Sequence, residues 1–147
     1  EFFEVERYRV ISERRRNARG ETVVESEAVV TLSTRDGART SYFKNEHAQE
    51  MTDDGPVNAL WQALKSDLGP YQDDIDDVRL TDFKVRITQG GIEAVTRVII
   101  DFADADGRAW STVGVSPNIV DASFEALLDA INWKLMRERS ADTRAAE

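Results

Sequence analysis

The sequence predicts an α+β fold: an internally duplicated βββα unit whose helices pack on antiparallel sheets. Two dipeptides typical of hairpin turns, Asp36-Gly37 and Asp106-Gly107, lie 70 residues apart, each between stretches of alternating apolar residues. Each half then ends in a segment whose apolar residues recur at helical spacing. Because element order, turn chemistry and helix pattern all repeat, we expect two copies of one unit related by pseudo-two-fold symmetry. At the same offset Ala28, Val30 and Leu32 fall on Val98, Ile100 and Phe102.

The first repeat is expected at about residues 2–69. Its three predicted strands are FEVERYRVI, which contains one slip in its alternation, TVVESEAVVTLSTR and ARTSYFKNEHAQ. In the second strand Ala28, Val30 and Leu32 share one side, which predicts a buried face. A helix is predicted in VNALWQALKSDL after Gly55-Pro56, since proline suits the first helical position.

The second repeat is expected at about residues 78–136. Its predicted strands are VRLTDFKVRIT, IEAVTRVIIDFAD and RAWSTVGVS, with QGG as a hairpin between the first two. The helix is predicted from Ile119 to Leu135, with Asn118 as its N-cap and Asp121 completing a capping-box-like arrangement. Residues 137–147 are expected to form a polar, frayed tail.

This second helix is predicted to be apolar around most of its circumference. Its polar residues form one narrow stripe: Asp121, Glu125, Asp129 and Asn132. A helix that lies on a single sheet needs an apolar face of only about a third of its circumference. A second surface is therefore expected to cover it, either the other repeat or a second copy in a homodimer, and the two possibilities are compatible.

Composition excludes several classes of protein. The chain has 147 residues, of which 41% are hydrophobic and 32% charged, which suits one soluble globular domain with no membrane span. Its net charge of -9 argues against nucleic acid as a partner. The absence of cysteine excludes disulfides and thiolate sites and fits a cytoplasmic location. The sequence starts directly in strand-like residues without Met, so we expect a piece of a longer protein.

Residue patterns for catalysis or metal binding are missing. His47 is the only histidine, and no catalytic triad or phosphate-binding loop can be assembled. The Asp-rich linker GPYQDDIDDVR lacks the glycine and distal glutamate of a calcium loop, so we expect it to be solvated. The chain itself is therefore expected not to be an enzyme. The two helix starts could bind a carboxylate through their free N–H groups, or could simply be well-capped ends.

Three segments suggest a family. The chain resembles the C-terminal regulatory domain of the 2-isopropylmalate synthase, citramalate synthase and homocitrate synthase family in WSTVGVSPNIVDASFEALLDAINWKL, DGPVNALWQAL and LTDFKVRI. The residues of the first motif are most similar to those of the citramalate synthase-like branch. The resemblance implies a regulatory domain that forms a homodimer and binds leucine or isoleucine as a feedback inhibitor. It also implies an N-terminal TIM barrel that condenses acetyl-CoA with a 2-oxo acid by means of a divalent metal. That barrel is not in this sequence, so catalytic residues, metal ligands and cofactors are not expected here.

By the same resemblance, the amino acid would bind near the two helix starts at the dimer interface. The residues implied are Gly55, Pro56, Val57, Asn58 and Ala59 in the first repeat, with Ser116, Pro117, Asn118, Ile119, Ala122 and Ser123 in the second. The chain carries Asp53-Asp54 where the family more usually has Gly-Asn. This departure motivates an alternative, a purely structural homodimerisation module without an effector.

Overall fold

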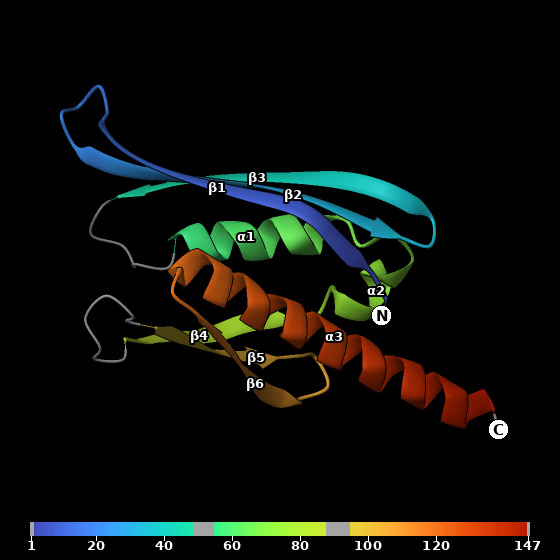
Figure 1. The fold of residues 1–147 in the computed structure, drawn as a ribbon. Coiled ribbons are helices and arrows are strands. Elements are labelled where there is room, and N and C mark those ends of the chain that lie inside the picture. Colours follow the sequence, from blue (N-terminus) through green and yellow to red (C-terminus); the bar gives the residue numbers. More distant parts are fainter. Residues whose placement is uncertain (1, 49–54, 88–94, 147) are drawn as a thin grey trace. The chain divides into compact units, whose positions relative to one another are not determined.

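The computed structural model describes residues 2–48, 55–87 and 95–146, and the side chains of 2–45, 57–87 and 95–139 (Figure 1). The chain divides into two compact units, Glu1–Pro70 and Tyr71–Glu147. Each unit contains an antiparallel three-stranded sheet followed by a helix, so the predicted βββα duplication and the α+β class are confirmed.

The first unit follows the predicted order closely. Its sheet has the order β1-β2-β3, and helix α1 packs on one face, mainly against β2 and β3 (Figure 1). The predicted buried side of β2 is confirmed, because Ala28, Val30 and Leu32 are all at most 1% exposed. They meet a helix whose apolar residues, including Leu60 and Leu64, are equally buried. The bounds are β1 Glu4–Arg16, β2 Thr22–Thr34, β3 Gly37–Ala48 and α1 Gly55–Ser66.

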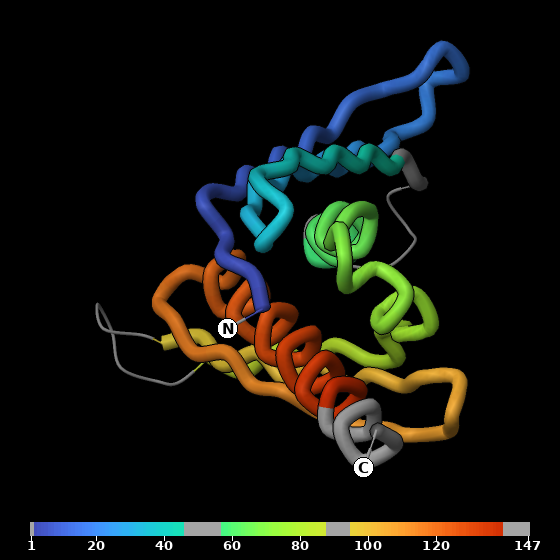
Figure 2. Tube along the Cα trace, turned by 90° about the vertical axis from the view of Figure 1, so that its right-hand side faces the viewer, coloured from blue at the N-terminus to red at the C-terminus, as the bar shows by residue number. Residues whose placement is uncertain are grey.

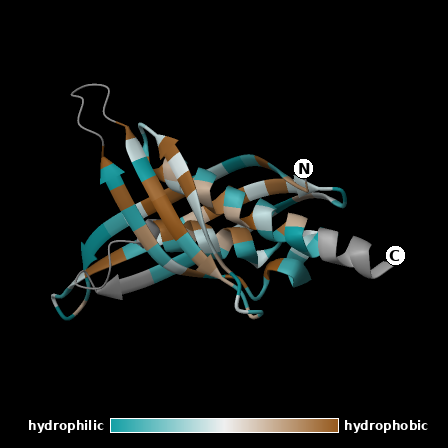
Figure 3. Ribbon diagram, turned by 90° about the horizontal axis from the view of Figure 1, so that it is seen from below, coloured by the Kyte–Doolittle hydropathy of each residue, from teal (hydrophilic) through white to brown (hydrophobic). Residues whose placement is uncertain are grey.

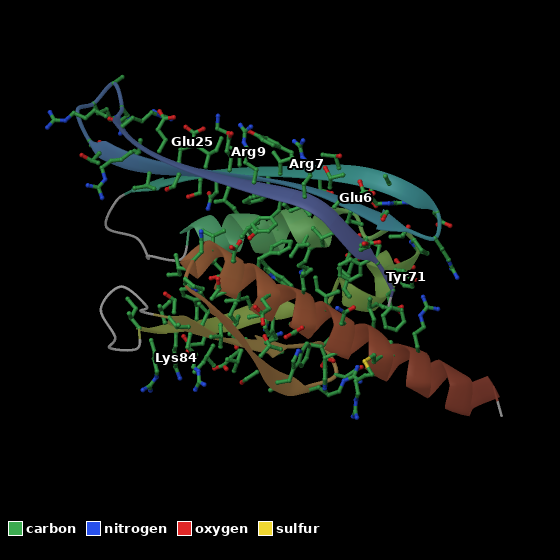
Figure 4. The ribbon with its side chains drawn as sticks, in the orientation of Figure 1. Glu6, Arg7, Arg9, Glu25, Tyr71 and Lys84 are labelled. Atoms are coloured by element: carbon green, nitrogen blue, oxygen red, sulfur yellow. The ribbon has the colours of Figure 1, made fainter. Side chains whose placement is uncertain are left out.

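The opposite face of this first sheet carries many charged residues. Glu6, Arg7, Arg9 and Glu25 project from it, away from α1 (Figure 4). Glu25 forms ion pairs with Arg15 on β1 and with Lys44 on β3. One face of this sheet is therefore covered by α1, and the other carries charged residues. Figure 3 shows hydrophilic and hydrophobic residues interspersed along the strands of the second sheet.

The predicted linker, inside which the second unit begins, has its acidic residues Asp73 and Asp76 exposed as expected, but its apolar residues are not solvated. It holds a 3-10 turn and the short helix α2, with Tyr71, Ile75 and Val78 buried. The sheet order is β4-β5-β6, and α3 packs on β5 and β6 (Figure 2). The bounds are η1 Gly69–Tyr71, α2 Gln72–Ile75, β4 Arg79–Ile87, β5 Thr96–Ala103, β6 Ala109–Ser116 and α3 Ile119–Ala146.

A matching irregularity in the first strand of each unit supports the duplication. The register between β1 and β2 shifts between Val5 and Arg7, and that between β4 and β5 shifts between Leu80 and Asp82. An extra residue in one strand moves all later side chains to the other face, which explains the slip in alternation seen in the first strand.

The predicted polar stripe of helix α3 is confirmed, but its predicted end is not. Asp121, Glu125 and Asp129 are exposed and Asn132 is half-buried, whereas residues between them, such as Ala122, Leu127 and Ile131, are buried. The predicted end at Leu135 is wrong, because the backbone stays helical to Ala146. The segment RERSADTRAA has no glycine or proline to stop it and is rich in arginine and alanine, which favour helix.

Several sequence predictions lie outside the described residues. These are the QGG hairpin at residues 89–91 and the Asp53-Asp54 departure. The backbone of His47 is in β3, but its side chain is also outside the described part.

Both predicted hairpin turns are confirmed. Gly37 and Gly107 have φ values of 117° and 82°, a backbone conformation that residues with a side chain rarely adopt.

Candidate functional site

The start of α3 is held by Asn118. Its side-chain Oδ1 accepts hydrogen bonds from the backbone N–H of Val120 (2.8 Å) and of Asp121 (3.3 Å). Its carbonyl accepts from the N–H of Ala122 at 3.0 Å, and its own N–H donates to Ser116 Oγ at 3.2 Å. The predicted N-cap is therefore confirmed, and it already satisfies two N–H groups of the first helical turn.

The residues predicted around this helix start differ in accessibility. Pro117, Asn118 and Ile119 are exposed, Ile119 at 44%, so a small ligand can reach them from solvent. Ala122 and Ser123 are fully buried, and Ser123 Oγ donates to the carbonyl of Ile119 at 2.8 Å. In the described conformation these two residues serve helix packing.

Gly114 allows the first turn of α3 to lie directly on β6. A Cβ atom at this position would overlap the carbonyl oxygen of Ala122 and lie 2.7 Å from its carbonyl carbon. Two residues earlier, on the same face of β6, Thr112 Oγ1 donates to the carbonyl of Ala126 at 2.7 Å. The helix start is thus fixed by backbone contact as well as by its cap. Sequence reasoning missed this role, because the distance between a glycine and a helix depends on tertiary packing.

The start of α1 is less completely defined. The helix begins at Gly55, one residue before the first helical position predicted at Pro56, and its side chains are described from Val57 onwards. Val57 and Ala59 are buried in the core, whereas Asn58 is half-buried. Of the described side chains predicted for this end, Asn58 is the one that can offer polar groups to a ligand.

A buried hydroxyl lies on the helix-facing side of the first sheet. Ser26 is 0% exposed, and its Oγ has no hydrogen-bond partner among the described residues. It pairs across the sheet with Asn45, close to the end of β3 and the connection to α1. Sequence reasoning missed Ser26, since a serine in an alternating strand gives no signal that it is unpaired.

A buried ion-pair network lies at the other end of the second sheet. Lys134 Nζ donates to Asp104 Oδ2 at 2.6 Å, and it lies 3.0 Å from Glu138 and 3.6 Å from Asp77. Arg108 joins it, with Nε 2.7 Å from Asp104 and Nη2 2.5 Å from Glu138. The side chains of Lys134 and Asp104 are 1% and 0% exposed.

The network fixes the charge states of its members. Burial alone would raise the pKa of Asp104, but hydrogen bonds from Lys134 and Arg108 outweigh it and lower that pKa to about 2. Burial would lower the pKa of Lys134, yet its bonds to Asp104 and Glu138 raise it. The carboxylates of Asp104, Asp106 and Glu138 lie close enough to share a cation, within 4.8 Å of one another. Lys134 and Arg108 already supply that positive charge, so the network serves to attach the β5–β6 turn to α3.

Comparison with known proteins identifies the family to which this domain belongs. The fold defines a duplicated α+β domain in which two βββα units each present a helix start. Residues 1–135 match the family described as the LeuA allosteric (dimerisation) domain, and the chain belongs to that family. The family resemblance predicted from the sequence is therefore confirmed.

The curated relatives are longer proteins. The chain is 37% identical over 143 residues to the (R)-citramalate synthase of Geobacter sulfurreducens, covering 96% of this chain and 25% of the relative. It is 36% identical over 140 residues to the enzyme of the same name from Aquifex aeolicus, covering 94% and 24%. A probable 2-isopropylmalate synthase of Archaeoglobus fulgidus is 31% identical over 85 residues, covering 58% and 16%. The chain thus spans about a quarter of the length of the citramalate synthases it matches.

None of the helices in the described part of the chain combines the length and apolar character that crossing a membrane requires.

Proposed function

We propose that this chain is the allosteric, dimer-forming domain of an acetyl-CoA-dependent acyltransferase of the citramalate or 2-isopropylmalate synthase type, and that it binds leucine or isoleucine for feedback inhibition. The observation that carries the proposal is the match to the allosteric (dimerisation) family over residues 1–135. The accessible, rigidly held start of α3 supports it, because helix N-termini favour carboxylates.

The chemistry of the helix starts suits an amino acid zwitterion. Its carboxylate would approach the first turn of α3, where Asn118 now holds the N–H groups and would have to share or release them. Its ammonium group needs acceptors, which the side chains of Asn118 and Ser116 can supply. Ile119 offers an exposed apolar side chain for the alkyl group. Leucine and isoleucine differ in the position of one methyl, a difference worth about 1–3 kcal/mol in a shaped pocket.

The parent protein is proposed to carry the catalytic part. The relatives are named as synthases. The family resemblance implies that an N-terminal barrel of the parent protein would condense acetyl-CoA with a 2-oxo acid by means of a divalent metal, in the cytoplasm. Ligand binding to this domain would then favour an arrangement in which the barrel works poorly. Coupling of this kind is typically worth about 1–3 kcal/mol.

The second candidate function is a purely structural homodimerisation module. It is favoured by the cap on α3, since Asn118 already satisfies N–H groups that a ligand carboxylate would need. The Asp53-Asp54 departure motivates it from the sequence. This alternative gives a stable dimer that does not respond to amino acids.

Isothermal titration calorimetry on the 147-residue chain separates the two functions. With leucine, isoleucine and valine as ligands, the allosteric function gives saturable heat with at least one of them. Binding should weaken in Asn118→Ala, which removes both polar groups of that side chain. Glu125→Ala is the matched control, an exposed residue further along the same helix. An absence of heat with all three ligands at millimolar concentration, in a chain that is still dimeric, would leave the structural module.

A further inference from the structure

Strand β4 carries an apolar face that its own helix leaves open. Directly opposite residues of antiparallel strands point to the same side of a sheet. Val85 is opposite Val98, and Ile87 is opposite Thr96. Val98 and Thr96 are buried on the side that α3 covers, yet Val85 and Ile87 are 36% and 69% exposed. Core-type residues on the helix side of β4 are therefore in contact with solvent.

The position of α3 explains why this surface stays open. The helix packs on β5 and β6, and Gly114 lets its first turn settle on β6. Strand β4 lies beyond β5, and two strand spacings amount to about 9.6 Å. A helix with its side chains is about 10–12 Å across, so one centred over β6 and β5 leaves β4 uncovered.

The two faces of β4 have different chemistry. The other face carries Asp82, Lys84 and Arg86, all exposed, and Lys84 projects away from α3 in Figure 4. Charged side chains on an edge strand oppose pairing with a further strand. Contact through the helix-side face, rather than through the edge, is therefore the arrangement that β4 favours.

The open face continues towards the start of α3. Ile87, Thr96 and Ser116 are cross-strand neighbours in one row at the end of the sheet. Ile119, which is 44% exposed, follows Ser116 by three residues. We call the exposed side chains of Val85 and Ile87, together with that of Ile119 on α3, the β4 patch. This patch lies at the same end of the second unit as the accessible helix start.

We propose that the β4 patch is a contact surface for a second copy of this chain. The inference rests on the dimer-forming part of the proposed function, and it adds the location of the contact. The occupant follows from the family, which is described as a dimerisation domain. A two-fold axis brings the same surface of both copies together, so an apolar patch is complementary to itself. A stable dimer buries about 800 Å² per partner, so the patch is the apolar centre of a larger contact.

Aspartate substitution on the two faces of the same sheet tests this location. Val85→Asp and Ile87→Asp place a charge in the proposed contact, whereas Val113→Asp and Val115→Asp place the same charge on the opposite face. The controls are likewise exposed β-branched apolar residues of the same sheet, since Val113 and Val115 are 44% and 46% exposed. Their cross-strand partners, Ile99 and Arg97, alternate with the buried residues of β5.

The readout is the dimer dissociation constant of the 147-residue chain by sedimentation equilibrium, with circular dichroism as the check on folding. The β4 variants should raise this constant at least about 100-fold, whereas the two controls should change it less than about threefold. Should an aspartate variant lose its folded spectrum, Ile87→Ser provides the same test, with an expected rise of about tenfold.

Each other outcome contradicts the location of the contact. A wild-type dimer whose dissociation constant is unchanged in Val85→Asp and Ile87→Asp moves the contact elsewhere and leaves dimerisation standing. Dissociation by Val113→Asp or Val115→Asp to the same extent would assign it to the opposite face. A monomeric wild-type chain would remove dimerisation itself, and calorimetric titration with leucine would show separately whether effector binding survives.

Discussion

Replacement of Lys134 by Met tests the buried ion-pair network. Methionine keeps an unbranched chain of similar volume, so the substitution removes the ammonium group with little change in packing. Asp104 then loses a hydrogen bond of 2.6 Å and Glu138 one of 3.0 Å. Removing one partner of a buried pair typically costs about 3–5 kcal/mol, because the remaining charge stays buried without compensation.

The structure places the expected loss near the lower end of that range. Arg108 still reaches both carboxylates, and Asp104 keeps hydrogen bonds from the backbone N–H groups of Asp106 and Arg108. We therefore expect Lys134→Met to lower the free energy of unfolding by about 3 kcal/mol at pH 7. Lys84→Met is the matched control: Lys84 is 59% exposed and lies 3.6 Å from Asp82, so we expect a loss below about 0.5 kcal/mol.

The same variant has a predictable pH dependence. The pKa of Asp104 falls from 3.8 to about 2 on folding, so its contribution is fully present above pH 4 and is lost as the pH falls through 2. This shift corresponds to about 2 kcal/mol in total, of which about half is lost at pH 3. Because Lys134 contributes part of this shift, the difference in stability between wild type and Lys134→Met should shrink between pH 7 and pH 3.

Urea unfolding followed by tryptophan fluorescence measures both quantities. The reasoning is refuted if Lys134→Met unfolds within 0.5 kcal/mol of wild type at pH 7, a threshold well below the about 3 kcal/mol expected for a buried pair. A difference that stays the same or grows at pH 3 would contradict the assignment of the low pKa to the bond between Lys134 and Asp104.

Three further substitutions test the packing and capping of α3 by the same unfolding assay. Gly114→Ala should cost about 3 kcal/mol because its methyl group meets helix backbone, whereas Gly107→Ala, where a Cβ meets nothing within 4 Å, should cost about 1 kcal/mol for its positive φ; equal losses would show that α3 does not depend on the close approach. Asn118→Ala should cost about 1 kcal/mol and Asn118→Asp almost nothing, and a cost for both would argue against capping. Thr112→Val should lose about 1 kcal/mol with its bond to the carbonyl of Ala126, and an unchanged stability would mean that water replaces this bond.

Local patterns in the sequence were sufficient to predict most of the fold. Alternation placed Ala28, Val30 and Leu32 on one face, and Gly37 and Gly107 marked turns that require positive φ. These signals depend on residues close together in the chain. The end of α3 was missed because no strong stop signal follows Leu135, and a polar composition alone does not end a helix.

Features that depend on distant residues could not be predicted from the sequence. Lys134 lies 30 residues from Asp104, and nothing in the local pattern showed that their charges meet in the core. Asp77 was grouped with a run of solvated acids, although it lies 3.6 Å from Lys134. At the candidate site the cap on α3 was predictable from the Asn118 side chain. The burial of Ala122 and Ser123 was not, because it follows from the approach of α3 to Gly114.

The central claim, that the start of α3 receives a branched-chain amino acid, is tested most directly by ¹⁵N NMR during titration with leucine and isoleucine. If the claim holds, the backbone amide signals of residues 118–122 move progressively and saturate, whereas those of the β2–β3 turn at Asp36 and Gly37 stay fixed. Signals of residues 118–122 that remain still throughout both titrations would contradict it.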